Sequence, residues 1–292
     1  MKMMQKVAPV FVTGAAILWG ILVIFVKQLS AAGLGSMEIV TLRVYGSALI
    51  LVLGLLLYNK KLLRIKLKDS WCFVGTGVVS IVFFSYCYFK NVTVSSVAVS
   101  SILMYTSPIW VTILSRFVFG ERIGSRKLVA LCMAIVGCAL VSGITGGVGK
   151  VSLEGILLGL GSGIGYGLYS IFGRIALEKG YHPMTVSAYT FLFACVGVLP
   201  FVNVGELISV MNTQPTLWGW AFAMAFFSTC MSFTLYTVGL KYMEAGKAAV
   251  LATLEPIVTT IVGVVVYREI VSVAMIVGIV LVLGASVLIS RK

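Results

Sequence analysis

Long apolar stretches, separated by short clusters of charged and turn residues, make up almost the whole chain. Each stretch is about 20 residues long, the length that an α-helix needs to cross the hydrocarbon core of a membrane, whereas the strands of a membrane barrel would be about half as long and would alternate apolar with polar residues. The pattern therefore predicts an all-α integral membrane protein. Its ten predicted transmembrane helices are 8–28, 36–58, 69–90, 96–117, 127–145, 153–175, 183–203, 216–240, 247–268 and 273–290.

Several short motifs occur twice, 147 or 148 residues apart. The matching segments are Ser107-Pro108 with Glu255-Pro256, Phe119-Gly120-Glu121 with Tyr267-Arg268-Glu269, and Trp19-Gly20 with Tyr166-Gly167. The spacing predicts an internal duplication, with one five-helix repeat in residues 1–148 and a second in 149–292. Because five is an odd number, the second repeat enters the membrane from the opposite side. Inverted repeats around a central cavity are typical of transporters.

The composition agrees with a membrane protein, since 60% of the residues are hydrophobic, 11% are charged, and the mean hydropathy is +1.10. The net charge of +13 lies in clusters between the apolar stretches, which favours a topology signal over a nucleic-acid-binding surface. Seventeen lysines and arginines fall on the side of the N-terminus, four (Lys27, Lys90, Lys150 and Arg268) fall on the other, and Arg43 lies inside a helix. The positive-inside rule then predicts a multi-pass protein of the cell membrane with both termini in the cytoplasm.

The sequence lacks the motifs of a metal site, a nucleotide site or an enzyme. Its six cysteines lie in or beside apolar stretches without CxxC spacing, and its one histidine, His182, lies in a predicted loop, so we expect no metal and no cofactor. No nucleotide-binding loop or nucleophile motif is present, so a gradient must drive any concentrative transport. Polar residues are too scarce at mid-membrane depth for a channel, and no constellation of reactive groups indicates an embedded enzyme.

Glu255 is the sharpest candidate functional residue, because a carboxylate beside a helix breaker is costly in the middle of an apolar helix. In a low-dielectric cavity its carboxyl group would tend to hold a proton, and exchange of that proton for a cationic or amino group would couple transport to protonation. The alternative is a structural role, in which the carboxyl group bonds a backbone group freed by Pro256. The duplicated position is Ser107, so a carboxylate is not needed to close the break.

Four aromatic residues could form a box for an organic cation or an aromatic side chain: Trp19, Tyr105, Tyr166 and Tyr169. Each of them could instead pack against lipid or the protein core. Trp19 and Tyr166 lie about halfway through their helices, at the same depth as the helix breaks at Pro108 and Pro256, so we expect them to share a central site.

Three further polar residues are candidates for substrate binding. Arg43 lies too deep for an ordinary loop charge and could bind a substrate carboxylate, although snorkelling or pairing with Glu38 is equally plausible. Ser80 and Ser228, which are 148 residues apart, could bond substrate or a neighbouring helix.

Two groups of residues are predicted to have structural roles. Glu121 and Glu269 are expected to form loop-orienting ion pairs with the adjacent Arg122 and Arg268. Glycines in the fifth and tenth predicted helices, including Gly137 and Gly278, indicate a packing or dimerisation face.

In combination these motifs resemble those of the EamA-type transporters of the drug/metabolite transporter superfamily. The residues that carry the resemblance are Trp19-Gly20, Leu254-Glu255-Pro256, Phe119-Gly120-Glu121 and Tyr267-Arg268-Glu269, the last replacing a usual Leu-Gly-Glu. The resemblance implies a basket of two inverted five-helix halves, with a cavity lined mainly by helices 1, 3, 4, 6, 8 and 9. It also implies movement of small metabolites, often amino acids and commonly outward, across a bacterial inner membrane.

We therefore expect a secondary transporter, monomeric or homodimeric, that exports or exchanges an amino acid or a related metabolite. The alternative is a proton-coupled carrier of a quaternary amine or hydrophobic cation, for which Glu255 would supply the counter-charge.

Overall fold

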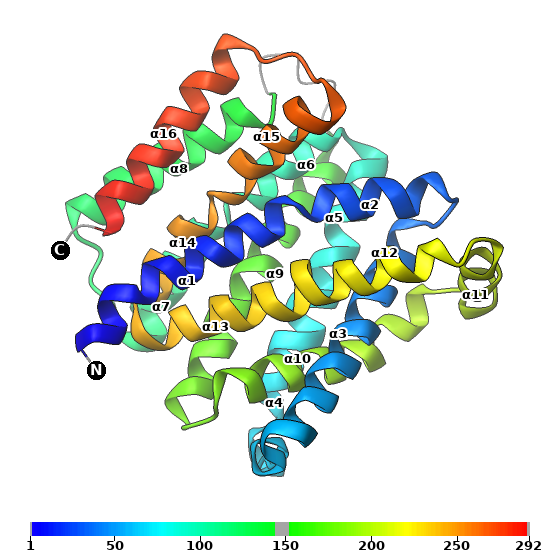
Figure 1. Cartoon of the computed structure of the whole chain (residues 1–292). Coiled ribbons are helices and arrows are strands. Elements are labelled where there is room, and N and C mark those ends of the chain that lie inside the picture. Colours follow the sequence, from blue (N-terminus) through cyan, green and yellow to red (C-terminus); the bar gives the residue numbers. More distant parts are fainter. Residues whose placement is uncertain (1, 144–151, 291–292) are drawn as a thin grey trace.

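The computed structural model describes residues 2–143 and 152–290, and the regular structure in these two ranges is helical (Figure 1). Three basic residues that entered the topology prediction, Lys150, Arg291 and Lys292, lie outside the described residues. The predicted repeat boundary at 148/149 and the predicted helix end at 145 also lie outside them.

Nine helical stretches in the described ranges are long and apolar enough to cross a membrane. They are Met3–Ala31, Ser36–Leu63, Leu67–Val94, Val97–Phe119, Leu153–Glu178, Pro183–Phe201, Thr216–Tyr242, Ala245–Tyr267 and Val273–Ser290. A further apolar helix of 17 residues, Ser125–Val141, coincides with the fifth predicted helix. The protein is thus a multi-pass helical membrane protein.

Most of these spans are assembled from shorter helical elements. In chain order the elements are α1 (Lys2–Gly20), α2 (Leu22–Ala31), α3 (Ser36–Asn59), η1 (Lys60–Leu63), η2 (Leu67–Asp69), α4 (Ser70–Val74), η3 (Gly75–Val82), α5 (Phe83–Val94), α6 (Val97–Met104), α7 (Ser107–Phe119), α8 (Ser125–Val141), α9 (Leu153–Glu178), α10 (Pro183–Val198), η5 (Leu199–Phe201), α11 (Val204–Thr213), α12 (Thr216–Ala225), η6 (Phe226–Met231), α13 (Ser232–Tyr242), α14 (Ala245–Ala252), α15 (Glu255–Tyr267) and α16 (Val273–Ser290).

Two spans are broken near their middle by proline. α7 and α15 each carry proline in the first turn, at Pro108 and Pro256, where the missing N–H costs no helical hydrogen bond. Adding 148 to the bounds of α6 and α7 gives the bounds of α14 and α15. The spacing seen between the sequence motifs is therefore also the spacing between helix breaks.

Two other spans contain a π-helical segment, η3 in the stretch α4–α5 and η6 in the stretch α12–α13. Such wide turns interrupt the regular helical hydrogen bonds and frequently occur at functional sites. Ser80 lies in η3 and Ser228 lies in η6, and both side chains are buried.

The helices form a bundle in which α9 crosses the interior and α8 and α16 lie side by side at one edge (Figure 1). A Cβ atom added at Gly137 of α8 would lie 2.8 Å from the carbonyl oxygen of Gly278 in α16. Glycine at this point therefore lets the two helices approach closely. The face predicted for packing or dimerisation forms, at these two residues, a contact within the chain.

The sequence pattern did not predict α11, a short helix between the spans α10–η5 and α12–α13. Its first turn is capped by the side-chain oxygen of Asn203, which accepts a hydrogen bond from the backbone N–H of Glu206 at 3.3 Å. At 10 residues it is too short to cross a membrane, so the length rule used for the spans could not detect it.

Candidate functional site

An aromatic cluster surrounds Trp19, which lies at the end of α1 and is only 6% exposed. The indole contacts Tyr166 of α9 edge-on, at 6.1 Å between ring centroids. It also contacts Phe233 and Tyr236 of α13, at 5.1 and 5.2 Å. These four residues, here called the aromatic cluster, bring three spans from both halves of the sequence together.

Glycine next to Trp19 allows this close approach. A Cβ atom added at Gly20 would lie 2.9 Å from the backbone carbonyl oxygen of Glu255, so α1 can pass this close to the break between α14 and α15. The sequence Trp19-Gly20 therefore combines a large ring that fills the centre with a small residue that admits the neighbouring helix.

Glu255 joins the aromatic cluster through Tyr166. The Tyr166 hydroxyl donates a hydrogen bond to Oε2 of Glu255 at 3.0 Å, and Phe84 packs against the Tyr166 ring at 5.3 Å. Glu255 is the first residue of α15, and a carboxylate is favoured at a helix N-terminus by the unpaired N–H groups and the helix dipole. The helix break thus places the Glu255 carboxyl group beside the aromatic rings.

Arg43 of α3 supplies the opposite charge. Its guanidinium group interacts electrostatically with Glu255 and with Tyr166, although no ion pair between Arg43 and Glu255 is present in the described ranges. Nε of Arg43 and Nε1 of Trp19 are both buried and have no hydrogen-bond partner in the part of the chain that the structure describes. Buried donors are normally bonded, so these two donors are available to an acceptor on a bound molecule.

The centre of the bundle is almost closed. A cavity of about 20 Å³ lies between the spans and is lined by Trp19, Ser80, Ile81, Ser107, Val111, Tyr166, Gly167, Tyr169, Ser170, Phe233, Tyr236, Ala249 and Ala252. This volume holds about one water molecule. A metabolite would therefore require the surrounding spans to move apart.

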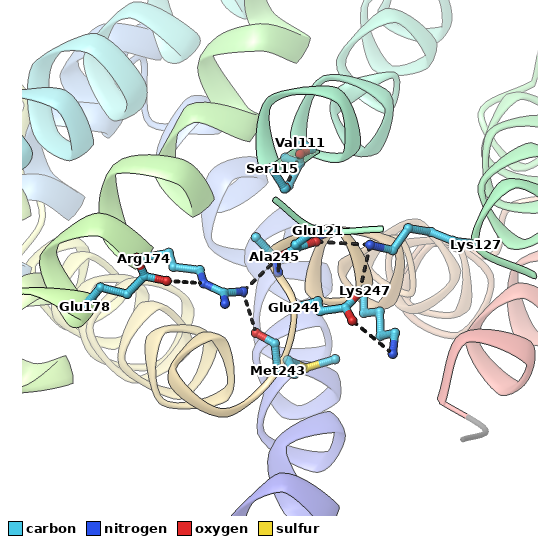
Figure 2. Close-up of polar contacts among 11 residues, drawn as sticks. Val111, Ser115, Glu121, Lys127, Arg174, Glu178, Met243, Glu244, Ala245 and Lys247 are labelled. Atoms are coloured by element: carbon cyan, nitrogen blue, oxygen red, sulfur yellow. Dashed lines mark hydrogen bonds and ion pairs between the residues drawn. The ribbon is translucent and has the colours of Figure 1, made fainter. Parts of the chain in front are cut away.

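A buried polar cluster closes one end of the span α14–α15 (Figure 2). The carboxylate of Glu121 accepts from Arg174 at 2.9 Å, from Lys127 at 3.1 Å, and from the backbone N–H groups of Ala245 and Gly246 at 2.7 and 3.3 Å. Lys127 also pairs with Glu244 at 2.8 Å. This Glu121 cluster ties the ends of α7, α8 and α9 to the start of α14.

Glu244 is held in the charged form by the same cluster. Partial burial raises the pKa of its carboxyl group, but hydrogen bonds and charge from Lys127, and then from Lys247, outweigh burial and leave the pKa below its ordinary value.

An ion pair between Lys27 and Glu269 lies at the other end of the span. Nζ of Lys27, in α2, lies 3.3 Å from Oε1 of Glu269, and the two side chains are 43% and 50% exposed. Lys27 also lies 3.5 Å from the centre of the Tyr267 ring. The predicted pairing of Glu121 with Arg122 and of Glu269 with Arg268 was wrong, because each carboxylate instead pairs with cations from other spans.

Comparison with known proteins identifies the family. The sequence model of the EamA-like transporter family matches this chain twice, at residues 7–143 and 153–291. The chain belongs to the EamA-like transporter family.

Relatives agree with this assignment. An uncharacterized transporter of Archaeoglobus fulgidus is 26% identical over 192 residues, which are 65% of this chain and 66% of that protein. The uncharacterized transporter YyaM of Bacillus subtilis is 24% identical over 75% of this chain and 73% of its own. The chain thus spans just under two thirds of the first relative and about three quarters of the second.

A protein of known crystal structure shares the fold, with a TM-score of 0.80 and 18% identity over 96% of this chain and 95% of that one. Membership of a transporter family, together with helices that can cross a membrane, means that this EamA-family chain is a membrane transporter and not an enzyme.

The structure brings some of the predicted site residues together and separates others. Trp19, Ser107, Tyr166 and Tyr169 line the central cavity, and Glu255 contacts it through Tyr166. Tyr105 does not line that cavity; it packs with Cys138, Ile257 and Val282, in a cluster against which Phe84, the neighbour of Tyr166, also packs.

The predicted serines differ from each other. The Ser80 hydroxyl lines the cavity but already donates to the carbonyl oxygen of Gly165 at 2.7 Å, so it joins η3 to α9. The Ser228 hydroxyl is buried and has no hydrogen-bond partner in residues 2–143 and 152–290, so it could bond a ligand or a water molecule.

Sequence reasoning missed three residues of this EamA-family site: Phe233, Tyr236 and Ser170. The Tyr236 hydroxyl bonds the Ser170 hydroxyl at 2.7 Å, and all three residues line the cavity. Tyr236 lies 148 residues after Tyr88, so the spacing that related Ser80 to Ser228 could have drawn attention to it.

Proposed function

We propose that this EamA-family protein is a gradient-driven carrier of a small zwitterionic metabolite, an amino acid or a close relative. Residues 1–148 and 149–292 form two inverted five-helix repeats, with Ser125–Val141 as the fifth of ten transmembrane helices. Glu255 binds the amino group of the substrate, Arg43 binds its carboxylate, and the aromatic cluster surrounds its side chain.

One observation carries this proposal: the Glu255 carboxyl group bonds the Tyr166 hydroxyl beside the cavity at 3.0 Å, and the Arg43 guanidinium group interacts electrostatically with both residues. Nε of Arg43 is buried and has no partner among the described residues. A zwitterion satisfies both charges, whereas a quaternary amine would leave the buried Arg43 donor unpaired. Leaving a buried donor without an acceptor is unfavourable.

Glu255 also supports coupling to protons. A carboxylate that binds an ammonium group can instead bind a proton, so the two compete for one site. Exchange of one for the other would link substrate movement to a proton gradient. We place the substrate's hydrocarbon part beside Trp19 and Tyr236, where it would displace the water that the small cavity can hold.

The closed cavity favours a carrier over a channel. At about 20 Å³ it admits no metabolite, so each passage requires the ends of the bundle to open and close around the site. We propose that the basic end, where Lys6, Lys241 and Lys247 line a hollow of about 690 Å³, faces the cytoplasm of a bacterial cell. We propose export or exchange across the inner membrane in that orientation.

Binding measurements separate the zwitterion from its alternatives. Thermal unfolding of the detergent-solubilised protein is recorded with each proteinogenic amino acid, at a mildly acidic and a mildly alkaline pH. Any amino acid that stabilises the protein is then compared with its decarboxylated amine and its deaminated acid. A ligand at about 100 times its Kd stabilises the folded state by about 2.7 kcal/mol, so binding is readily seen.

We expect the amino acid to raise the melting temperature and both single-charge analogues to have little effect. Glu255→Gln and Arg43→Gln should each abolish the shift. Glu206→Gln, which changes an exposed carboxylate on α11, serves as the matched control. Stabilisation by choline or by the amine alone would favour the quaternary-amine alternative and overturn the zwitterion proposal.

A further inference from the structure

The ion pairs at the two ends of the bundle occupy equivalent positions in the duplicated sequence. Glu269 lies 148 residues after Glu121, and Arg174 lies 147 residues after Lys27. The pair Arg174–Glu121 therefore corresponds to the pair Lys27–Glu269, with the roles of the two halves exchanged.

The backbone around the two carboxylates is also equivalent. Gly120 and Arg268 both end their helices in the left-handed conformation, with φ of 68° and 59°. The N–H of Glu121 then bonds the carbonyl oxygen of Ser115, and the N–H of Glu269 bonds that of Gly263, at 3.2 and 3.1 Å. The same turn thus presents a carboxylate at the end of α7 and at the end of α15.

The two pairs lie at opposite ends of one membrane span. Glu121 contacts Ala245, where the span α14–α15 begins, whereas Glu269 follows Tyr267, where it ends. This span has 23 residues, which corresponds to roughly 35 Å of helix. Glu255 lies between them, near the middle of the span.

The two ends are closed to different degrees. Glu121 is buried, and its side chain bonds two cations and two backbone N–H groups. Glu269 is half exposed and pairs with Lys27. Opening the Glu121 end therefore requires several buried bonds to break, whereas opening the Glu269 end breaks, among the described residues, the exposed contacts of Lys27 with Glu269 and with the Tyr267 ring.

We propose that Glu121 and Glu269, with Arg174 and Lys27, form the two gates of the transport cycle and that the gates open alternately. They are positioning residues, since they touch neither the aromatic cluster nor Glu255. With no substrate bound, the Glu121 gate stays closed and the Lys27–Glu269 gate opens more readily. The proposal rests on the carrier function, because a gate has meaning only if substrate passes between the two ends.

Hydrogen exchange in lipid nanodiscs tests this alternation without a substrate, because exchange reports the local opening equilibrium of each helix end. Deuterium uptake is compared for the wild type, Glu121→Gln and Lys27→Glu, with Glu206→Gln as the control. Uptake is followed in peptides covering residues 170–178 and 245–252 at one end, and residues 22–31 and 263–269 at the other.

We expect reciprocal changes. Glu121→Gln should raise exchange at 170–178 and 245–252 by more than about tenfold, as for loss of a buried charged partner, and should lower it at 22–31 and 263–269. Lys27→Glu should raise exchange at 22–31 and 263–269 and lower it at 170–178 and 245–252. The rise should be at most about fivefold, because the ion pair of Lys27 is exposed. The double variant Lys27→Glu with Glu269→Lys should return both ends to the wild-type pattern.

A rise confined to the mutated end, with no fall at the opposite end, would show local loosening and overturn the gate proposal. If Glu121→Gln does not fold, Lys27→Glu and the double variant Lys27→Glu with Glu269→Lys still test the gate proposal. Both side chains are about half exposed, so we expect these two variants to fold. Reciprocal exchange together with a protein that binds no amino acid would leave the gates intact and refute the zwitterion function. If the protein binds an amino acid but exchange at the two ends does not change in opposite directions, the gate proposal is refuted and the zwitterion function is not.

Discussion

The ends of α7 and α15 have the same turn and the same glutamate, yet their surroundings differ. At the end of α7, Glu121 is met by Lys127 from α8 as well as by Arg174. At the position 148 residues after Lys127 the chain has Met275, so Glu269 lacks the equivalent second cation. The same turn and the same glutamate thus occur twice, and the neighbouring residues set how many cations hold each carboxylate.

The largest difference should appear when each carboxylate is removed. Glu121→Ala leaves Lys127 and Arg174 without their buried partner, and we expect it to destabilise the protein by about 3 kcal/mol or more. Glu269→Ala should cost at most about 1 kcal/mol, because its pair is exposed. Thermal unfolding of both variants in one detergent measures the contrast, and equal losses would refute it.

The two helix-ending turns offer a reciprocal test. Arg268 adopts a left-handed conformation that costs a residue with a side chain about 1 kcal/mol or more, while Gly120 adopts it freely. Arg268→Gly should therefore raise the melting temperature and Gly120→Ala should lower it. A lower melting temperature for Arg268→Gly would mean that the Arg268 side chain contributes more than the turn costs.

Salt should distinguish the two ion pairs. At about 1 M salt the screening length falls to about 3 Å, which weakens exposed pairs far more than buried ones. The stability difference between the wild type and Lys27→Met should shrink at high salt, from at most about 1 kcal/mol. The difference caused by Arg174→Met should persist. A loss of both differences would show that the Glu121 cluster is accessible to solvent ions.

The smallest effect concerns Glu244, whose pKa lies below the ordinary value of 4.5. A lowered pKa in the folded state stabilises the protein above pH 4.5, and this contribution disappears as the pH falls through the lower, folded value. Glu244→Gln should therefore be slightly less stable than the wild type at neutral pH and equal to it in stronger acid. A difference that stays constant with pH would exclude a charge contribution from Glu244.

Features with a regular spacing could be predicted from the sequence. The spans follow from apolar length, and the 148-residue spacing anticipated the matching breaks before Pro108 and Pro256. The same reasoning placed Trp19 and Tyr166 at one depth, and in the structure their rings are 6.1 Å apart.

Contacts between distant spans could not be predicted. Spacing places a residue along a helix but does not say which neighbour its side chain meets, so Glu121 was assigned to the adjacent Arg122 when its partners are Lys127 and Arg174. Spacing likewise did not reveal that Tyr105 packs with Cys138, Ile257 and Val282 and does not line the central cavity. A short helix such as α11 has neither the length nor the repeat that would reveal it.

Counterflow in proteoliposomes tests the central claim, a carrier with Glu255 at its substrate site, most directly. Vesicles holding the protein and an excess of unlabelled amino acids are diluted into a trace of the same amino acids in radiolabelled form. We predict transient, saturable accumulation of label by the wild type and by Glu206→Gln, and none by Glu255→Gln. Accumulation that persists in Glu255→Gln, or uptake by the wild type that never saturates, would contradict the account.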